Sequence, residues 1–360
     1  MTISKLVLAL LFCVEMLVAQ TTGVPRNIII MIGDGMGVSQ VTAGRTAKGS
    51  LSLERFKTMG LLLTHAAGKD YITDSAAGAT ALSTGAKTYN GAIGVRPDTT
   101  AVENVFERAK KRGKKIGLVV VCSVTHATPA CFVAHVPSRT MELEIARQIS
   151  EGSTDLLLGS GWGWFLPKSQ GGRRTDERNL IASMQKRGYT YVSQESEFHS
   201  LAVKDSMKLV GLFAENHVAP AQERKPSLKE MTALALKSLS QSKDGFVLMV
   251  EGSQIDWAAH DHKSNQIMIE ISDFDDAIGE VVDFAGRDPK TLVIVTADHE
   301  TGGYSLVNGS LESKTVEGKF TTGGHTGTMV PLFAMGPGAE QFGGIRQDSD
   351  VGVLLLKLLQ

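Results

Sequence analysis

Acidic and histidine residues recur in short motifs whose spacing suits a metal ion. In "VEGSQIDWAAHDH", Asp256 and His260 are four residues apart, so a helix beginning near Ile255 places both on one face. Two side chains at this spacing can hold one metal ion. His262 lies about 200° round such a helix from His260, and we expect it to be a solvated surface residue. Glu251 ends the preceding apolar run and offers a carboxylate for a harder cation.

Two more motifs add ligands of the same kinds. "LVIVTADHETGG" presents Asp298 and His299 at the end of an apolar run, and "TTGGHTGTMVP" carries His325 in a glycine-rich loop. A turn after the run can aim both residues of the Asp-His pair at one ion, although a hydrogen-bonded pair at a strand end is the alternative.

Asp34 stands between two glycines in "IIIMIGDGMG", directly after an apolar run. The glycines at 33, 35 and 37 do not have the G-x-G-x-x-G spacing, which argues against a dinucleotide site. A turn with a helix-capping aspartate is the structural alternative to a metal ligand.

A serine and an arginine supply different chemistry. Ser75 in "TDSAAGATALSTG" is followed almost wholly by small residues, which indicate either close helix packing or room for a ligand beside the serine. "VTHATPACFVAHVPSR" contributes His126, Thr128 and Arg139. The guanidinium of Arg139 can donate hydrogen bonds to two phosphate oxygens, although the usual role of an arginine is a surface salt bridge.

The elements that must position these residues follow from the apolar pattern. Continuous apolar, β-branched runs alternate with helical stretches such as 99–112 and 227–242, which predicts an α/β protein with a mainly parallel sheet covered on both faces. The runs are "RNIIIMIGDG", "KIGLVVVCSV", "TDLLLGSG", "GFVLMVEGS", "TLVIVTADHE" and "VPLFAMGPG". Polar or acidic residues stand where several runs end, and ligands of open α/β sheets bind at the carboxyl ends of strands. We therefore expect residues far apart in sequence to gather along one edge of the sheet.

Composition and the first residues limit the class of protein. With 42% apolar and 21% charged residues and a formal net charge of −1, the chain has the make-up of a soluble globular protein without overall basicity for nucleic acid. Residues 1–19 have the pattern of a signal peptide, which predicts a secreted or periplasmic protein with no stable membrane insertion after cleavage.

Residues 20–360 carry no evident linker and are expected to form one catalytic domain, in which 160–225 is a peripheral insertion or cap. Cys122 and Cys131 are equally compatible with a disulfide and with buried free thiols.

Taken together, the motifs resemble the alkaline phosphatase family. "GDGMG", "TDSAAGATA", "HATPACFVAHVPSR", "VEGSQIDWAAH", "TADHETGG" and "GGHTG" occur in the family's order and approximate spacing, from about residue 26 to 338. The resemblance implies a three-layer α/β/α sandwich with a mainly parallel central sheet.

Carried over position by position, the resemblance implies two Zn²⁺ and one Mg²⁺ per chain. Its ligand sets are Asp256, His260 and His325 for the first zinc, Asp34, Asp298 and His299 for the second, and Asp34, Thr128 and Glu251 for magnesium. Ser75 matches the nucleophile and Arg139 the phosphate-binding arginine.

The implied activity is hydrolysis of phosphate monoesters at alkaline pH through a phosphoserine intermediate, by a homodimer that acts on small phosphomonoesters and binds no specific nucleic acid. The alternatives are a phosphodiesterase of the same superfamily and a non-catalytic metal- or phosphate-binding protein. No cysteine stands at the nucleophile position, which argues against a sulfatase that depends on a modified cysteine.

Two positions within the motifs vary in the family. His126 stands where some relatives carry an aspartate that supports magnesium through water, so we expect magnesium to be held more weakly. Trp257 stands where others have lysine or histidine near the phosphate. The absence of a cation there predicts weaker inhibition by the phosphate product.

Overall fold

The computed structural model describes residues 23–204 and 207–360. The predicted signal peptide lies outside the described residues. No helix within the described residues is long and apolar enough to cross a lipid bilayer.

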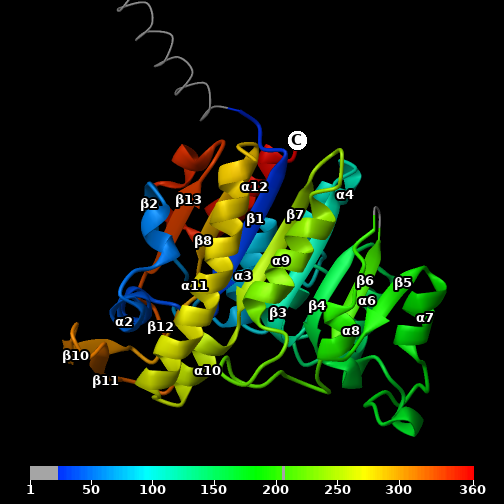
Figure 1. Ribbon diagram of the computed structural model, residues 1–360, viewed down its shortest axis with the longest axis horizontal. Coiled ribbons are helices and arrows are strands. Elements are labelled where there is room, and N and C mark those ends of the chain that lie inside the picture. Colours follow the sequence, from blue (N-terminus) through cyan, green and yellow to red (C-terminus); the bar gives the residue numbers. More distant parts are fainter. Residues whose placement is uncertain (1–22, 205–206) are drawn as a thin grey trace, which may run out of the picture.

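The apolar runs form the centre of one large sheet (Figure 1). The residues of β1, at its middle, are all buried, as expected for a strand covered on both faces. The ten strands assigned to this sheet in the described chain lie in the order β14 (Gly344–Gln347), β2 (Thr58–Leu63), β13 (Val330–Met335), β8 (Thr291–Thr296), β1 (Asn27–Gly33), β7 (Phe246–Gly252), β3 (Lys115–Ser123), β4 (Leu156–Ser160), β6 (Lys208–Leu212) and β5 (Tyr189–Val192). Among them, β13 runs antiparallel to both of its neighbours and the other pairings are parallel.

Helices cover both faces of the sheet. Figure 1 shows α9 and α11 crossing the front of the sheet, with α3 and α12 behind it. The longer helices are α2 (Val38–Lys48), α3 (Ser75–Thr84), α6 (Glu142–Glu151), α9 (Leu228–Leu239), α11 (Ser264–Arg287) and α12 (Asp348–Leu358), and the shorter ones are α4 (Val105–Lys111), α5 (Ala127–Ala130), α7 (Leu180–Lys186), α8 (Glu195–His199) and α10 (Gln254–His260). The prediction of a three-layer α/β/α sandwich with a mainly parallel sheet is confirmed.

Strand register aligns the residues that will form the site. Ile32 of β1 lies level with Thr296 of β8 and Glu251 of β7, and Glu251 lies level with Val120 of β3. The carboxyl ends of four adjacent strands therefore meet at one edge of the sheet.

Two small antiparallel pairs follow β8. β10 (Ser305–Ser310) and β11 (Thr315–Lys319) form a hairpin, and β9 (Glu300–Thr301) pairs with β12 (His325–Thr326). The second pair places His325 opposite Thr301, beside the end of β8.

The small residues of α3 allow close packing. A Cβ atom on Gly78 would lie 2.8 Å from the carbonyl oxygen of Asp298, and one on Gly352 of α12 would lie 2.3 Å from the backbone nitrogen of Gly85. These glycines let α3 approach both the end of β8 and α12. Packing therefore accounts for these two glycines. The resemblance favours room for a metal ion and phosphate as the reason for the small residues after Ser75, and that interpretation stays a prediction.

One predicted helix begins later than expected. The stretch 99–112 forms α4 only from Val105, because Asn104 and Glu107 make a reciprocal capping box that starts the helix there. The helix predicted over 227–242 is found as α9, capped by Ser227. Within 160–225, β6 and β5 extend the sheet at its outer edge, and the assignment of this segment as an insertion or cap stays a prediction.

Candidate active site

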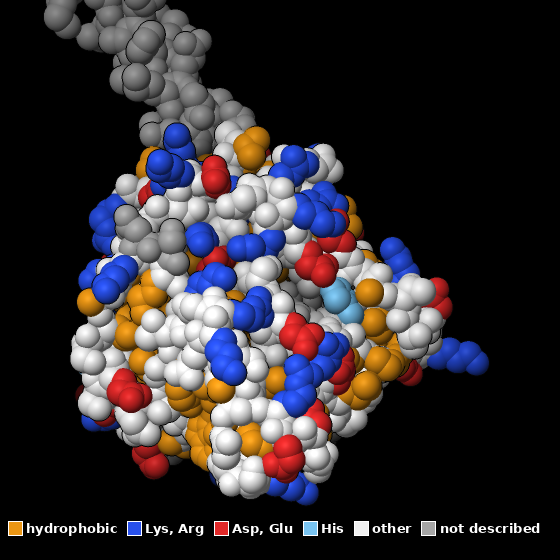
Figure 2. All heavy atoms as spheres, turned by 90° about the vertical axis from the view of Figure 1, so that its right-hand side faces the viewer, with side chains coloured by type: hydrophobic (Ala, Val, Ile, Leu, Met, Phe, Trp, Pro, Cys, Tyr) orange, Lys and Arg blue, Asp and Glu red, His pale blue; other side chains and the backbone are white. Residues whose placement is uncertain are grey.

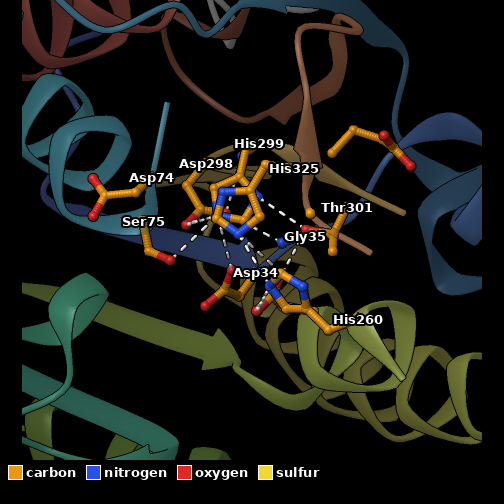
Figure 3. Close-up of polar contacts among 12 residues, drawn as sticks. Asp34, Gly35, Asp74, Ser75, His260, Asp298, His299, Thr301 and His325 are labelled. Carbon is orange, nitrogen blue, oxygen red and sulfur yellow. Dashed lines mark hydrogen bonds and ion pairs between the residues drawn. The ribbon is translucent and has the colours of Figure 1, made fainter. Parts of the chain in front are cut away.

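Two aspartates and a histidine meet at the carboxyl ends of β1 and β8 (Figure 3). The Nε2 atom of His299 lies 3.4 Å from Oδ1 of Asp34 and 3.4 Å from Oδ2 of Asp298. All three side chains are fully buried. This is the set of residues that the sequence analysis assigned to the second zinc.

A neighbouring group is built on α10. Its helical turn brings Nε2 of His260 to 3.3 Å from Oδ2 of Asp256, and β12 brings Nε2 of His325 to 3.6 Å from Oδ1 of the same aspartate. The Nδ1 atoms of His260 and His325 lie 2.6 and 2.9 Å from the carbonyl oxygens of Gly323 and Thr73. A proton on Nδ1 satisfies each carbonyl and leaves the Nε2 lone pair free for a metal.

Ser75 begins α3 and faces the same place. Its hydroxyl lies 3.2 Å from Nε2 of His299, and the preceding Asp74 caps the helix by accepting a hydrogen bond from the backbone of Ala77. Arg139 donates to Asp74 over 3.0 Å and lies 3.2 Å from Nε2 of His126. Asp74 thus caps the helix that begins with the nucleophile candidate and also binds the arginine, at a helix N-terminus that favours an anion.

A third group lies one strand further along the sheet, at the ends of β7 and β3. Glu251 and Thr128 are fully buried there, and ligand atoms of Glu251, His126 and Cys122 lie within 4.8 Å of one another. Cys122 and Cys131 are buried and form no disulfide in the described chain, which resolves the alternatives left by the sequence.

The site holds more acidic charge than its own side chains neutralise. Burial, followed by the charge of Asp298, raises the pKa of Glu251 to about 8. Burial, followed by the charge of Asp256, raises the pKa of Asp298 to about 7, and burial also raises that of Asp34. Burial lowers the pKa of His299 to about 4, so this histidine stays neutral and supplies no compensating charge near neutral pH.

Bound cations would offset this excess of negative charge, and the donor atoms present suit such ions. Within the described residues, both carboxylate oxygens of Asp34, Oδ2 of Asp298, Oε1 of Glu251 and Oγ1 of Thr128 are buried without a hydrogen-bond partner. A buried polar atom without a partner costs about 1–3 kcal/mol, and a metal ion removes that cost. Imidazole and carboxylate ligands around the first two groups suit zinc.

Three residues beside the site were not identified from the sequence as site residues. Asp74 holds Arg139, and Thr301 donates from its hydroxyl to Oδ1 of Asp256. The ring of His217 lies 4.7 Å from that of Trp257 and 5.8 Å from that of His126, between centroids. Asp74 had a visible signal, because it precedes Ser75 directly, whereas His217 had none.

Known proteins resemble this chain in sequence over most of its length. The sequence profile of the family described as "Alkaline phosphatase" matches residues 25–319. Alkaline phosphatase 4 of Bacillus subtilis is 35% identical over 93% of this chain and 89% of its own length. The alkaline phosphatase of Escherichia coli is 32% identical over 91% of this chain and 84% of its own.

A solved structure also matches. The alkaline phosphatase from the Antarctic bacterium TAB5 has a TM-score of 0.85 at 38% identity, covering 94% of this chain and 99% of that one. A histidine-to-glutamate variant of the same enzyme is described with magnesium bound in its M3 site. With most of its length matched by the family profile and its fold shared, this chain belongs to the alkaline phosphatase family of metal-dependent phosphate monoester hydrolases.

Proposed function

We propose that the chain hydrolyses phosphate monoesters at alkaline pH through a phosphoserine intermediate on Ser75. The observation that carries this proposal is the placement of the Ser75 hydroxyl at the start of α3, 3.2 Å from His299 and beside both histidine–aspartate groups. A serine so placed is the nucleophile that phosphoryl transfer requires.

The ligand sets support two Zn²⁺ and one Mg²⁺ per chain. Asp256, His260 and His325 would hold the first zinc, and Asp34, Asp298 and His299 would hold the second. Asp34, Thr128 and Glu251 offer oxygen donors for magnesium. When bound, the ions supply positive charge that makes an oxygen nucleophile available at lower pH and stabilises the leaving oxygen.

The chain's own groups carry the two displacements. The Ser75 oxygen loses its proton and forms a bond to phosphorus as the bond from phosphorus to the ester oxygen breaks, and the ester oxygen takes up a proton and leaves as the alcohol. Water then displaces the serine oxygen, which regains a proton as inorganic phosphate is released. Arg139, oriented by Asp74, donates two parallel hydrogen bonds to the phosphate oxygens. Trp257 borders the substrate on the side of His126 and adds no charge there.

We also propose a secreted or periplasmic homodimer that acts on small phosphomonoesters. The resemblance is the basis for the homodimer, and light scattering of the purified protein tests it. On the face in Figure 2, Lys and Arg are interspersed with Asp and Glu, which gives no support for a nucleic-acid partner.

The test of the proposed reaction is hydrolysis of an aryl phosphate at about pH 9 with zinc and magnesium, before and after EDTA, beside the matching diester. Fast turnover of the monoester that EDTA abolishes supports the proposal. Dominant turnover of the diester identifies a phosphodiesterase instead. No turnover with zinc bound identifies a binding protein.

A further inference from the structure

Cys122 is a buried thiol at the metal-bearing edge to which the proposed reaction gives no role. It lies near the end of β3, fully buried, with its Sγ atom 3.5 Å from Oε2 of Glu251 and 3.2 Å from the carbonyl oxygen of Ser123. Its side chain thus contacts a residue proposed to bind the third cation.

Strand register and a direct contact place this thiol beside the carboxylate of Glu251. Ile32, Glu251 and Val120 lie level on three adjacent parallel strands. Asp34 and Cys122 each stand two residues after one of these positions. β3 is irregular between Val119 and Ser123, and it is the 3.5 Å contact between Sγ of Cys122 and Oε2 of Glu251 that places the thiol beside this carboxylate. The sulfur therefore belongs to the row of ligands at this edge of the sheet.

Several buried polar atoms of the third group, at the ends of β7 and β3, have no hydrogen-bond partner in the described residues. In residues 23–204 and 207–360, Oε1 of Glu251, Oγ1 of Thr128 and Nδ1 of His126 are buried and accept or donate no hydrogen bond. Glu251 and Thr128 are fully buried. One ligand atom from each of Cys122, His126 and Glu251 falls within 4.8 Å of the other two.

This donor set differs from the one that magnesium prefers. Magnesium binds hard oxygen ligands in near-ideal octahedral geometry, whereas sulfur and imidazole select zinc and similar transition metals. Oxygen donors alone suit magnesium, but a thiolate and an imidazole at the same site favour zinc.

We propose that the third site of this chain binds zinc in preference to magnesium, with the Cys122 thiolate as a ligand beside Glu251 and His126. The inference rests on the same metal centre as the proposed function but replaces the magnesium assigned there with a third zinc ion. It does not depend on the proposed reaction. As the sulfur–metal bond forms, the thiol proton passes to solvent, and no change of oxidation state is involved.

X-ray absorption at the zinc edge tests the unmodified protein. The full chain is loaded by dialysis against zinc together with excess magnesium. A sulfur neighbour at about 2.3 Å from zinc is expected. A zinc shell of nitrogen and oxygen only, with magnesium in the third site, overturns the inference.

Cobalt substitution identifies the sulfur. Cys131 provides a matched control, because it is equally buried but contacts Thr80 and the carbonyl oxygen of Ala76 instead of the ligand row. The wild type and Cys131→Ser loaded with Co²⁺ should both show near-ultraviolet thiolate-to-cobalt absorption, and Cys122→Ser should lack it. Identical spectra for Cys122→Ser and the wild type overturn the inference.

Metal counting gives the expected size of the effect. Replacing the thiolate should weaken zinc binding at the third site by at least about tenfold, so that Cys122→Ser retains two zinc ions and one magnesium where the wild type retains three zinc ions. Circular dichroism checks folding, and Cys122→Ala is the second variant. If the protein is an active phosphatase without a zinc–sulfur signal, this inference is wrong and the proposed function stands. If a zinc–sulfur signal is found without turnover, the proposed function is wrong and this inference stands.

Discussion

The two ends of the central strands bury carboxylates in opposite ways. At the amino ends, Asp155 accepts hydrogen bonds from Lys110, Lys115 and the backbone of Ile116, each over 2.9 Å. Asp288, which is only half-buried, accepts there from Arg26 and Asn27.

At the carboxyl ends, Asp34, Glu251 and Asp298 are buried without cationic side chains to match them, and atoms of each have no hydrogen-bond partner in the described chain. The comparison separates two uses of buried charge. Asp155 and Asp288 have partners within the chain and stabilise the fold. The carboxylate oxygens without partners at the other end are available to bind ions.

The largest expected effect is on turnover at the carboxyl end. Ser75→Ala removes the nucleophile, and we expect kcat for an aryl phosphate to fall on the order of 10³-fold or more, with metal content and melting temperature unchanged. Steady-state kinetics with metal analysis measures this. Turnover within tenfold of the wild type would show that Ser75 is not the nucleophile.

A pair of neutralising substitutions sharpens the contrast between the two ends. Asp155→Asn breaks a buried charged network, so the free energy of unfolding should fall by about 2–3 kcal/mol with kcat unchanged. Glu251→Gln should lower kcat about 10²-fold, yet leave the metal-free protein at least as stable, because the fold without ions already favours an uncharged side chain at this position. Urea unfolding of metal-free protein and kinetics of loaded protein compare the two. Equal loss of stability in both variants would contradict the distinction.

Removing the ions should make the carboxyl end sensitive to pH. The raised pKa values of Asp298, about 7, and Glu251, about 8, mean that the metal-free fold favours their protonated forms. That contribution to stability is complete below their ordinary pKa values and is lost as the pH rises through 7 and 8.

The melting temperature of EDTA-treated protein should therefore fall by about 5 °C between about pH 5.5 and 8.5, and that of metal-loaded protein should not. Differential scanning calorimetry on both forms measures the difference. A metal-free protein that is more stable at the higher pH would refute this account of the buried carboxylates.

The smallest effect concerns product release. Trp257 lies against His126 and His217 without adding a charge, so Trp257→Lys should lower the inhibition constant for inorganic phosphate about tenfold. Trp257→Phe is the matched control and should stay near the wild-type value. An unchanged constant in Trp257→Lys would show that a cation at this position does not reach the phosphate.

Much of the fold and site follows from local sequence pattern. Apolar runs ending in Asp34, Glu251 and Asp298 identify strands and the edge at which they meet, because side chains at the ends of parallel strands converge. The spacing of Asp256 and His260 likewise predicts their contact, since one helical turn separates them.

Other features depend on contacts that no local pattern encodes. His217 reaches the site from the segment between β6 and α9, with no acidic or histidine residue at the spacing of metal ligands to mark it. The late start of α4 reflects the competition between helix propensity and the capping box of Asn104, which the sequence analysis overlooked.

The position of β1 in the sheet has a consequence for how the chain folds as it is made. Ile28 pairs with Val247 on one side and Leu292 on the other, so the strand made first acquires its sheet neighbours only when most of the chain exists. Such distant pairings are slow to form, and synthesis proceeds from the N-terminus. A fragment that stops before β7 leaves β1 unpaired and lacks Glu251, Asp256 and everything after them. The catalytic centre is therefore assembled late, and a chain that has acquired its full set of ions has already completed its central sheet.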